Sequence, residues 1–136
     1  MVKVIMGLKG TGKTKQLIEL VRKAADSEDG SVVCMEKSPK LTYDIPHTVR
    51  LIETDDYDIK GYDCMRGFIC GLHAANYDIT HIFIDSLLRI IDRDVDSDMA
   101  EFLDWCESFS TRENVKFTMM ISADTSLASA AVKKYF

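Results

Sequence analysis

The stretch GLKGTGKT, residues 7–14, follows directly on the apolar run VKVIM, residues 2–6. A short, continuous apolar run is typical of a strand that is buried on both faces. After the stretch, apolar residues recur at helical spacing and predict a helix over residues 13–25. The sequence therefore predicts that residues 7–14, called the glycine-rich loop below, connect a buried strand to a helix.

The rest of the chain repeats this alternation of strand and helix. Further strands are predicted over residues 32–37, 49–54, 81–88 and 116–122. Helices are predicted over residues 62–77 and 98–109 and, in a short form, over the tail 126–136. A capping box of Asp98 and Glu101 is expected to begin the second of these helices. Such an alternation indicates an α/β protein with a parallel sheet.

Length and composition limit the possible protein classes. The 136 residues, 46% hydrophobic and 29% charged, predict a single globular domain over residues 1–136. No apolar run reaches the roughly 18 residues of a membrane span, and no secretory signal precedes the first strand, so we expect no membrane association. The net charge of −5 and the lack of a dense basic patch do not favour a nucleic-acid partner.

The cysteines predict neither a metal site nor a disulfide framework. They include no C-x-x-C pair, and three of them fall on apolar positions of the predicted helices: Cys64, Cys70 and Cys106. Free cysteine packs as a small apolar side chain, so we expect core positions and a reducing, cytoplasmic location.

The glycine-rich loop has the spacing G-x-x-x-x-G-K-[ST], which suits a phosphate ligand. Backbone N–H groups of such a loop can point inward, and the helix that follows adds roughly half a positive charge at its N-terminus. Glycines let the chain approach a phosphate without a Cβ clash. Lys13 is then expected to reach the β- and γ-phosphates, while the Thr14 hydroxyl binds Mg²⁺.

With this spacing the loop resembles the Walker A motif of the P-loop NTPases. That resemblance implies a second motif, an apolar strand that ends in an aspartate whose carboxylate holds the Mg²⁺. The stretch HIFIDS, residues 81–86, supplies this pattern, with Asp85 as the expected metal-binding carboxylate beside Thr14. The resemblance also implies which residues contact the nucleotide: Gly7, Leu8, Lys9, Gly10, Thr11, Gly12, Lys13, Thr14 and Lys15.

Two predicted strands intervene between the motifs, and the chain therefore looks most like a minimal RecA-like domain. This resemblance implies a three-layer sandwich with a five-stranded parallel sheet in the order 3-2-4-5-1. It also implies a water-activating carboxylate at Glu36, with Glu53 as the second choice, and a polar sensor at Ser122. Alternatively, Glu36 is only a solvated residue at a strand end. Asp124 would be an unusual sensor.

Two further features of the site are less specific in the sequence. Arg89 and Arg93 follow Asp85 and could reach the phosphates of a neighbouring subunit, or could belong to a solvated surface. The guanine signature N-K-x-D does not occur, so ATP is favoured. Three tyrosines are candidates for stacking on the base: Tyr43, Tyr57 and Tyr135.

The resemblance favours a small ATP-binding protein with Mg²⁺-dependent ATPase activity that is slow or stimulated by a partner. One alternative is a small-molecule kinase, for which the chain offers room only in residues 38–48 and 86–97. The other is a non-hydrolysing module that regulates a protein partner. A homo-oligomer is also compatible with the resemblance.

Overall fold

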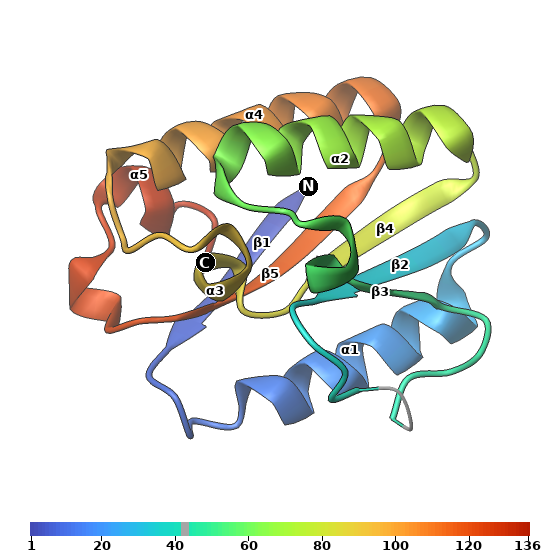
Figure 1. Ribbon diagram of the computed structural model, residues 1–136, viewed down its shortest axis with the longest axis horizontal. Coiled ribbons are helices and arrows are strands. Elements are labelled where there is room, and N and C mark those ends of the chain that lie inside the picture. The colour runs from blue at the N-terminus through green and yellow to red at the C-terminus, as the bar shows by residue number, and fades with distance from the viewer. Residues whose placement is uncertain (42–43) are drawn as a thin grey trace.

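A parallel sheet of five strands runs through the described part of the chain, residues 1–41 and 44–136 of this computed structural model (Figure 1). The strands are β1 (Val2–Gly7), β2 (Ser31–Glu36), β3 (Arg50–Glu53), β4 (Ile79–Ile84) and β5 (Lys116–Ser122). Their order across the sheet is β1-β5-β4-β2-β3, and every neighbouring pair is parallel. The predicted order is confirmed, since 3-2-4-5-1 is the same order read from the other edge.

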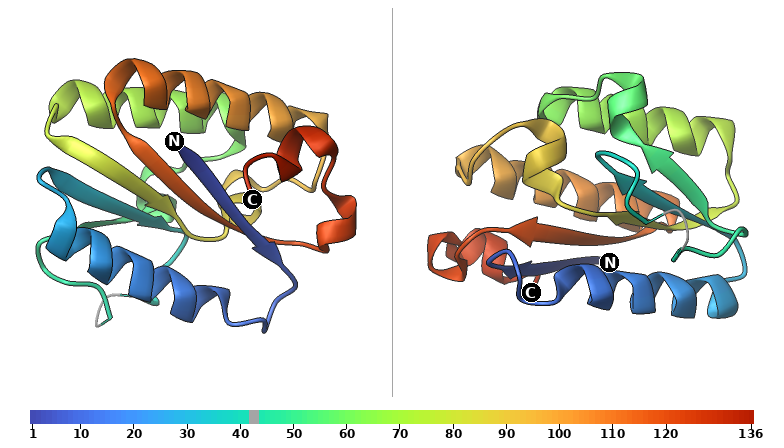
Figure 2. Two further views of the ribbon diagram at one scale, coloured as in Figure 1. Left: turned by 180° about the vertical axis from the view of Figure 1, so that it is seen from behind. Right: turned by 60° about the horizontal axis from the view of Figure 1, so that its bottom comes forward.

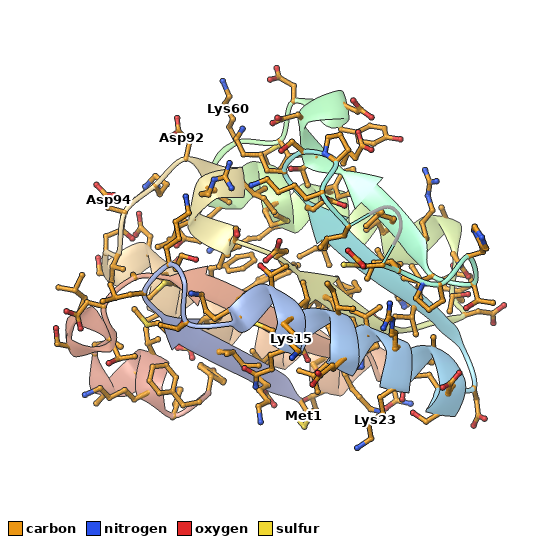
Figure 3. The ribbon with its side chains drawn as sticks, turned by 90° about the horizontal axis from the view of Figure 1, so that it is seen from below. Met1, Lys15, Lys23, Lys60, Asp92 and Asp94 are labelled. Carbon is orange, nitrogen blue, oxygen red and sulfur yellow. The ribbon has the colours of Figure 1, made fainter. Side chains whose placement is uncertain are left out.

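Helices cover both faces of this sheet and make three layers. Helix α1 (Lys13–Ser27) lies on one face, and α2 (Gly61–Ala75) and α4 (Ser97–Glu113) lie together on the other (Figures 1 and 2). Seen from the side of α1, Lys15 and Lys23 lie on the exposed surface of that helix (Figure 3). The remaining helical elements are short: η1 (Thr54–Tyr57), α3 (Leu87–Ile91), η2 (Thr125–Leu127) and α5 (Ala130–Lys133).

Each face of the sheet has its own apolar cluster. Under α1, the fully buried Leu17 and Val21 pack with Phe83 of β4. On the other face, Ile69 of α2 and Phe102 of α4 belong to the larger cluster. Burying one such side chain contributes roughly 1.5–3 kcal/mol, so both faces hold the helices firmly against the strands.

Strand register brings four chain segments to one edge of the sheet. Gly7 at the end of β1 pairs with Ser122 at the end of β5. Beyond the end of β4, the Asp85 backbone N–H donates to the Met35 carbonyl of β2 at 2.8 Å. Glu36 ends β2. The carboxyl ends of the strands are where open α/β sheets bind ligands.

Several predicted ends of strands and helices are wrong. Strand β4 ends at Ile84 and not at residue 88, because Leu87 begins helix α3. Helix α4 is capped by Asp96, whose side chain accepts from the Asp98 N–H at 3.0 Å, so the predicted capping box at Asp98 is wrong. The predicted tail helix divides into η2 and α5.

The expectation of core cysteines holds only in part. Cys34 and Cys106 are buried, but Cys64 and Cys70 are exposed on α2. Within the described ranges, no helix is both long and apolar enough to cross a membrane.

His81 is a buried ionisable group within β4, four residues before Asp85. One ring nitrogen lies 2.9 Å from Thr118 Oγ1, and the ring stacks on Phe83 with 4.0 Å between centroids. Burial lowers the pKa of His81 from 6.5 to about 4, although the nearby Glu28 carboxylate raises it. The neutral form of this histidine is therefore the one that the fold accommodates.

We predict that an alanine at Gly30 destabilises the protein by roughly 1–3 kcal/mol. A Cβ there would lie 2.1 Å from the Asp78 carbonyl oxygen, a backbone atom that cannot move without disturbing β4. The matched control is Gly67→Ala on α2, where a Cβ meets nothing within 4 Å, and which should stabilise by roughly 0.5–1 kcal/mol. Denaturant unfolding measures both, and equal effects of the two variants would contradict the close approach at Gly30.

We also predict that His81 makes unfolding pH-dependent. Its folded-state pKa of about 4 lies below the ordinary 6.5, so the unfolded chain binds the proton more readily between these values. The free energy of unfolding should rise with pH over this window, by roughly 2–3 kcal/mol from this group, and its contribution should level off above it. In His81→Gln that slope should shrink, whereas His47→Gln, at an exposed site, should keep it. An unchanged slope in His81→Gln would refute the assignment.

Candidate functional site

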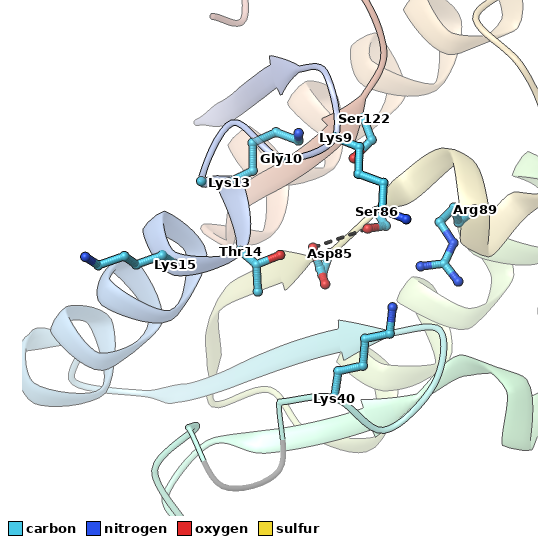
Figure 4. A pocket seen from close by; sticks show the side chains of 11 residues that line it. Lys9, Gly10, Lys13, Thr14, Lys15, Lys40, Asp85, Ser86, Arg89 and Ser122 are labelled. Carbon is cyan, nitrogen blue, oxygen red and sulfur yellow. Dashed lines mark hydrogen bonds between the residues drawn. The ribbon is translucent and has the colours of Figure 1, made fainter.

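A pocket of about 550 Å³ opens at the carboxyl edge of the sheet (Figure 4). This volume lies within the range of about 300–1,000 Å³ that is usual for ligand pockets. We call it the cationic pocket, and its lining residues are Lys9, Gly10, Gly12, Lys13, Thr14, Lys15, Lys40, Asp85, Ser86, Arg89 and Ser122. They come from the glycine-rich loop and the start of α1, from the β2–β3 loop, from the β4–α3 junction and from the end of β5.

The glycine-rich loop has the backbone that a loop around an anion needs. Gly10 and Gly12 have φ of 87° and 83°, a left-handed conformation that glycine adopts without the strain of a Cβ. Gly12 is also the N-cap of α1, and it has no side chain to accept from the first-turn N–H groups. Those N–H groups lack intrahelical partners and carry the positive end of the helix dipole. The pocket wall at Gly12 is therefore suited to a negatively charged ligand.

Lys13 is held against this loop. Its ammonium donates to the Leu8 carbonyl at 2.7 Å and to Thr11 Oγ1 at 3.3 Å. The Thr11 hydroxyl also donates to the Leu8 carbonyl, at 2.7 Å. The Lys13 side chain is 8% exposed, so its ammonium is a buried cation. In the two contacts above, its partners are neutral oxygens. An anion entering the loop could replace those oxygens with a stronger partner.

Thr14 and Asp85 both line the cationic pocket, and in the close-up the Thr14 hydroxyl points toward Asp85 (Figure 4). Burial raises the pKa of Asp85, and the Ser86 hydroxyl, 3.4 Å from the carboxylate, opposes that shift. Ser86 itself has a φ of 57°, which is uncommon and costly for a residue other than glycine. A partly buried carboxylate next to a strained residue is typical of functional sites.

These two residues fit a magnesium ion in the chemistry of their donor atoms. Mg²⁺ prefers oxygen ligands, and it is commonly held by one or two carboxylates together with waters and phosphate oxygens. Among the described residues, no group of three His, Cys, Asp or Glu side chains gathers as a metal site. Thr14 and Asp85 therefore suit an ion that shares its coordination with a ligand.

Positive charge gathers in the cationic pocket although the chain as a whole carries −5. Asp85 is the acidic lining residue, and the cations are Lys9, Lys13, Lys15, Lys40 and Arg89. In the close-up, Lys40 and Arg89 extend toward each other on the side away from the glycine-rich loop, while Lys15 points away from the pocket (Figure 4). Such a concentration of cations favours a polyanionic ligand.

Glu36 is buried, at 2% exposure, and the expectation of a merely solvated strand end is wrong. Its Oε1 accepts from the backbone N–H groups of Lys40 and Leu41 at 2.7 and 3.3 Å. Its Oε2 is buried and has no hydrogen-bond partner among the residues that the structure describes. Burial raises the pKa of Glu36, and the two N–H groups partly offset this rise. The carboxylate lies next to Asp85 in a small space shared with Lys40 and Arg89.

Other residues that the sequence suggested have different surroundings. Arg93 pairs with Asp96 and Asp98 at the start of α4, whereas Arg89 lines the pocket of its own chain. Among the described lining residues of the cationic pocket there is neither Glu53 nor Asp124. Of the loop, Gly7, Leu8 and Thr11 support the wall without lining it.

The candidate base-stacking tyrosines are not brought to the cationic pocket. Tyr57 packs beside Phe68, with 5.6 Å between the ring centroids, and Tyr135 donates to Asp104 at 2.5 Å. Neither lines the pocket within the part of the chain that the structure describes. Tyr43 lies outside the described residues.

Lys40 is the lining residue that the sequence did not point to. It lies in an irregular loop, where no periodicity marks a functional position. The only available signal was its place after the carboxyl end of a strand, because loops at that edge of a parallel sheet surround ligands.

We predict that Asp85→Asn makes the ligand-free protein more stable, by up to about 1 kcal/mol. Burial of the carboxylate disfavours its charged form, as its raised pKa indicates, and an amide carries no charge to bury. The exposed Asp29→Asn is the matched control and should change stability little. Thermal unfolding measures both, and a clear loss of stability in Asp85→Asn would contradict the argument.

Comparison with known proteins supports the fold. No family model matches the chain, and no curated protein matches its sequence. Among solved structures, the chain is similar to the flagellar accessory protein FlaH from Methanocaldococcus jannaschii, with a TM-score of 0.59 and 14% identity. The match covers 98% of this chain and 65% of that one, so this chain spans less than two thirds of the length of its structural neighbour. At this identity the similarity establishes the fold, and the chain has a RecA-like fold.

Proposed function

We propose that the protein binds a nucleoside triphosphate, with ATP favoured, together with Mg²⁺ in the cationic pocket, and hydrolyses it slowly or with the help of a partner. The observation that carries this proposal is the glycine-rich loop, whose left-handed glycines lead into the first turn of α1 at the wall of a pocket that Thr14 and Asp85 also line. An N-terminus of this kind is a ready site for phosphate.

The charge of the pocket supports a triphosphate over a single phosphate. Cations lie on both sides of it, with Lys13 on the loop and Lys40 and Arg89 opposite. A chain of phosphates can contact both sides at once. Lys13 would exchange the Leu8 carbonyl for a phosphate oxygen, which gives a charge-assisted hydrogen bond in place of a neutral one.

Magnesium would be held by the Thr14 hydroxyl and the Asp85 carboxylate. When bound, the ion neutralises charge that develops on the phosphates during transfer. Asp85 is suited to this role because its carboxylate is already partly buried and because its backbone N–H is fixed by the Met35 carbonyl. The Asp85 side chain therefore loses little conformational entropy when the ligand binds.

Hydrolysis also needs a group that orients water, and Glu36 is the candidate: among the described residues it does not line the cationic pocket itself, but it borders a small space together with Asp85, Lys40 and Arg89. Its Oε1 is occupied by backbone N–H groups, which leaves Oε2 for that role. We propose slow turnover because one oxygen of this carboxylate is already engaged and because the oxygen left for water is buried.

A small-molecule kinase is the second candidate, and a specific observation favours it. A second pocket, of about 590 Å³, adjoins the cationic pocket and shares Arg89 and Ser122 with it. Its apolar lining includes Leu88, Val95 and Leu127. A phosphoryl acceptor bound there would lie beside the same arginine as the nucleotide. A non-hydrolysing regulatory module would need the cationic pocket alone.

We predict that Lys13→Ala lowers the affinity for Mg-ATP by roughly 100-fold, because it removes the buried cation of the loop. The matched control is Lys23→Ala, which removes an equal charge from the exposed surface of α1 (Figure 3). Titration calorimetry measures both variants. Full affinity in a folded Lys13→Ala protein would refute the assignment of the loop.

Phosphate release separates the three activities. Under the proposed function, the purified protein with Mg-ATP alone releases inorganic phosphate, and Glu36→Gln stops turnover while it keeps binding. A kinase would consume ATP only when an acceptor is supplied, and a regulatory module would bind ATP without consuming it. Binding with no phosphate release, unaffected by candidate acceptors or protein partners, would overturn the hydrolytic part of the proposal.

A further inference from the structure

The loop between β2 and β3 carries a cation into the cationic pocket from the side opposite the glycine-rich loop. Lys40 is exposed, and its side chain extends toward Arg89 (Figure 4). Arg89 extends from α3 toward the same space. Two cations that face each other across a space of this kind repel when it is empty and are both stabilised when an anion lies between them.

The backbone around Lys40 is anchored on both sides of its Cα. Glu36 accepts from the Lys40 N–H at 2.7 Å, and from the Leu41 N–H at 3.3 Å. The Leu41 side chain is 1% exposed and packs under α1 in the cluster that contains Leu17 and Phe83. The position of Lys40 is therefore set by a buried carboxylate before it and by the apolar core after it, while its side chain is exposed at the pocket.

Lys40 also lies near the proposed metal-binding carboxylate. Lys40, Asp85 and Arg89 line the cationic pocket together, and the same three residues border the small space that Glu36 shares with them. Lys40 thus contributes to the electrostatics of the pocket although it is remote from the glycine-rich loop in sequence.

We infer that Lys40 and Arg89 bind the terminal phosphate of the nucleoside triphosphate within a single chain, and that Glu36 is the positioning residue of Lys40. This inference rests on the proposed function. It assigns the discrimination between a triphosphate and a diphosphate to Lys40 and Arg89, on the side of the pocket opposite the glycine-rich loop. The glycine-rich loop and Lys13 hold the phosphates that both ligands share. The two far cations meet the phosphate that only the triphosphate has, and no arginine from another subunit is needed.

The test is titration calorimetry of the intact chain with ATP and with ADP, each in the presence of Mg²⁺. In Lys40→Met the affinity for ATP should fall tenfold or more, while the affinity for ADP stays within about twofold, since one charge-assisted hydrogen bond to the terminal phosphate is lost. Lys40→Arg should restore most of the ATP preference. Lys23→Met, which removes the same charge from the surface of α1, should leave both affinities unchanged.

Variants of Glu36 test the positioning role. Glu36→Gln keeps a carbonyl oxygen that can accept from the Lys40 N–H, so its ratio of ATP to ADP affinity should stay near that of the unmodified protein. Glu36→Ala removes the acceptor and should lower this ratio as Lys40→Met does. A role in stability alone would lower the unfolding temperature and leave the ratio unchanged, which would overturn the positioning role.

The outcomes separate this inference from the proposed function. An unmodified protein that binds neither nucleotide would overturn both. If it binds ATP and Lys40→Met keeps the same ratio of affinities, nucleotide binding stands and the role of Lys40 is overturned.

Discussion

The candidate site depends on the backbone N–H groups in the first turn of α1, which have no hydrogen-bond acceptor within the helix. Gly10 and Gly12, both left-handed, turn the chain from β1 into α1, and the residues of this first turn, 12–15, line the cationic pocket. Unpaired donors at a helix start attract negative charge. The helix is held in place by Leu17 and Val21, which are fully buried against the sheet, so the donors have a fixed direction.

The parallel sheet explains why the remaining groups gather at the same place. Because all strands run the same way, Gly7, Asp85, Glu36 and Ser122 reach one edge from four different strands. The order of the strands places β4 between β5 and β2, so Asp85 lies between the glycine-rich loop and the loop that Glu36 anchors. A single-chain pocket with cations on both sides is the consequence. The RecA-like fold supplies the frame, and the residues at its edge determine the ligand.

The sequence predicted the frame and one wall of the site well, because both depend on local patterns. Buried strands read as apolar runs, and the glycine-rich loop is marked by its spacing. The end of β4 was not predictable in this way, since the apolar residues of α3 continue the run beyond Asp85 and Ser86. The exposure of Cys70 was missed because apolar spacing alone does not say how wide the buried face of α2 is. Lys40 carries no such pattern, because it lies in an irregular loop and its place in the pocket depends on the position of β2 beside β4.

The backbone N–H groups of the glycine-rich loop are the proposed donors to the phosphates, and amide NMR spectra observe them directly. On addition of Mg-ATP, we expect the amide resonances of Gly10, Gly12, Lys13 and Thr14 to move strongly and to saturate, while those of Gly67 and Gly71 on α2 remain in place. A spectrum of the folded protein in which the resonances of the glycine-rich loop do not move at any ATP concentration would contradict the account.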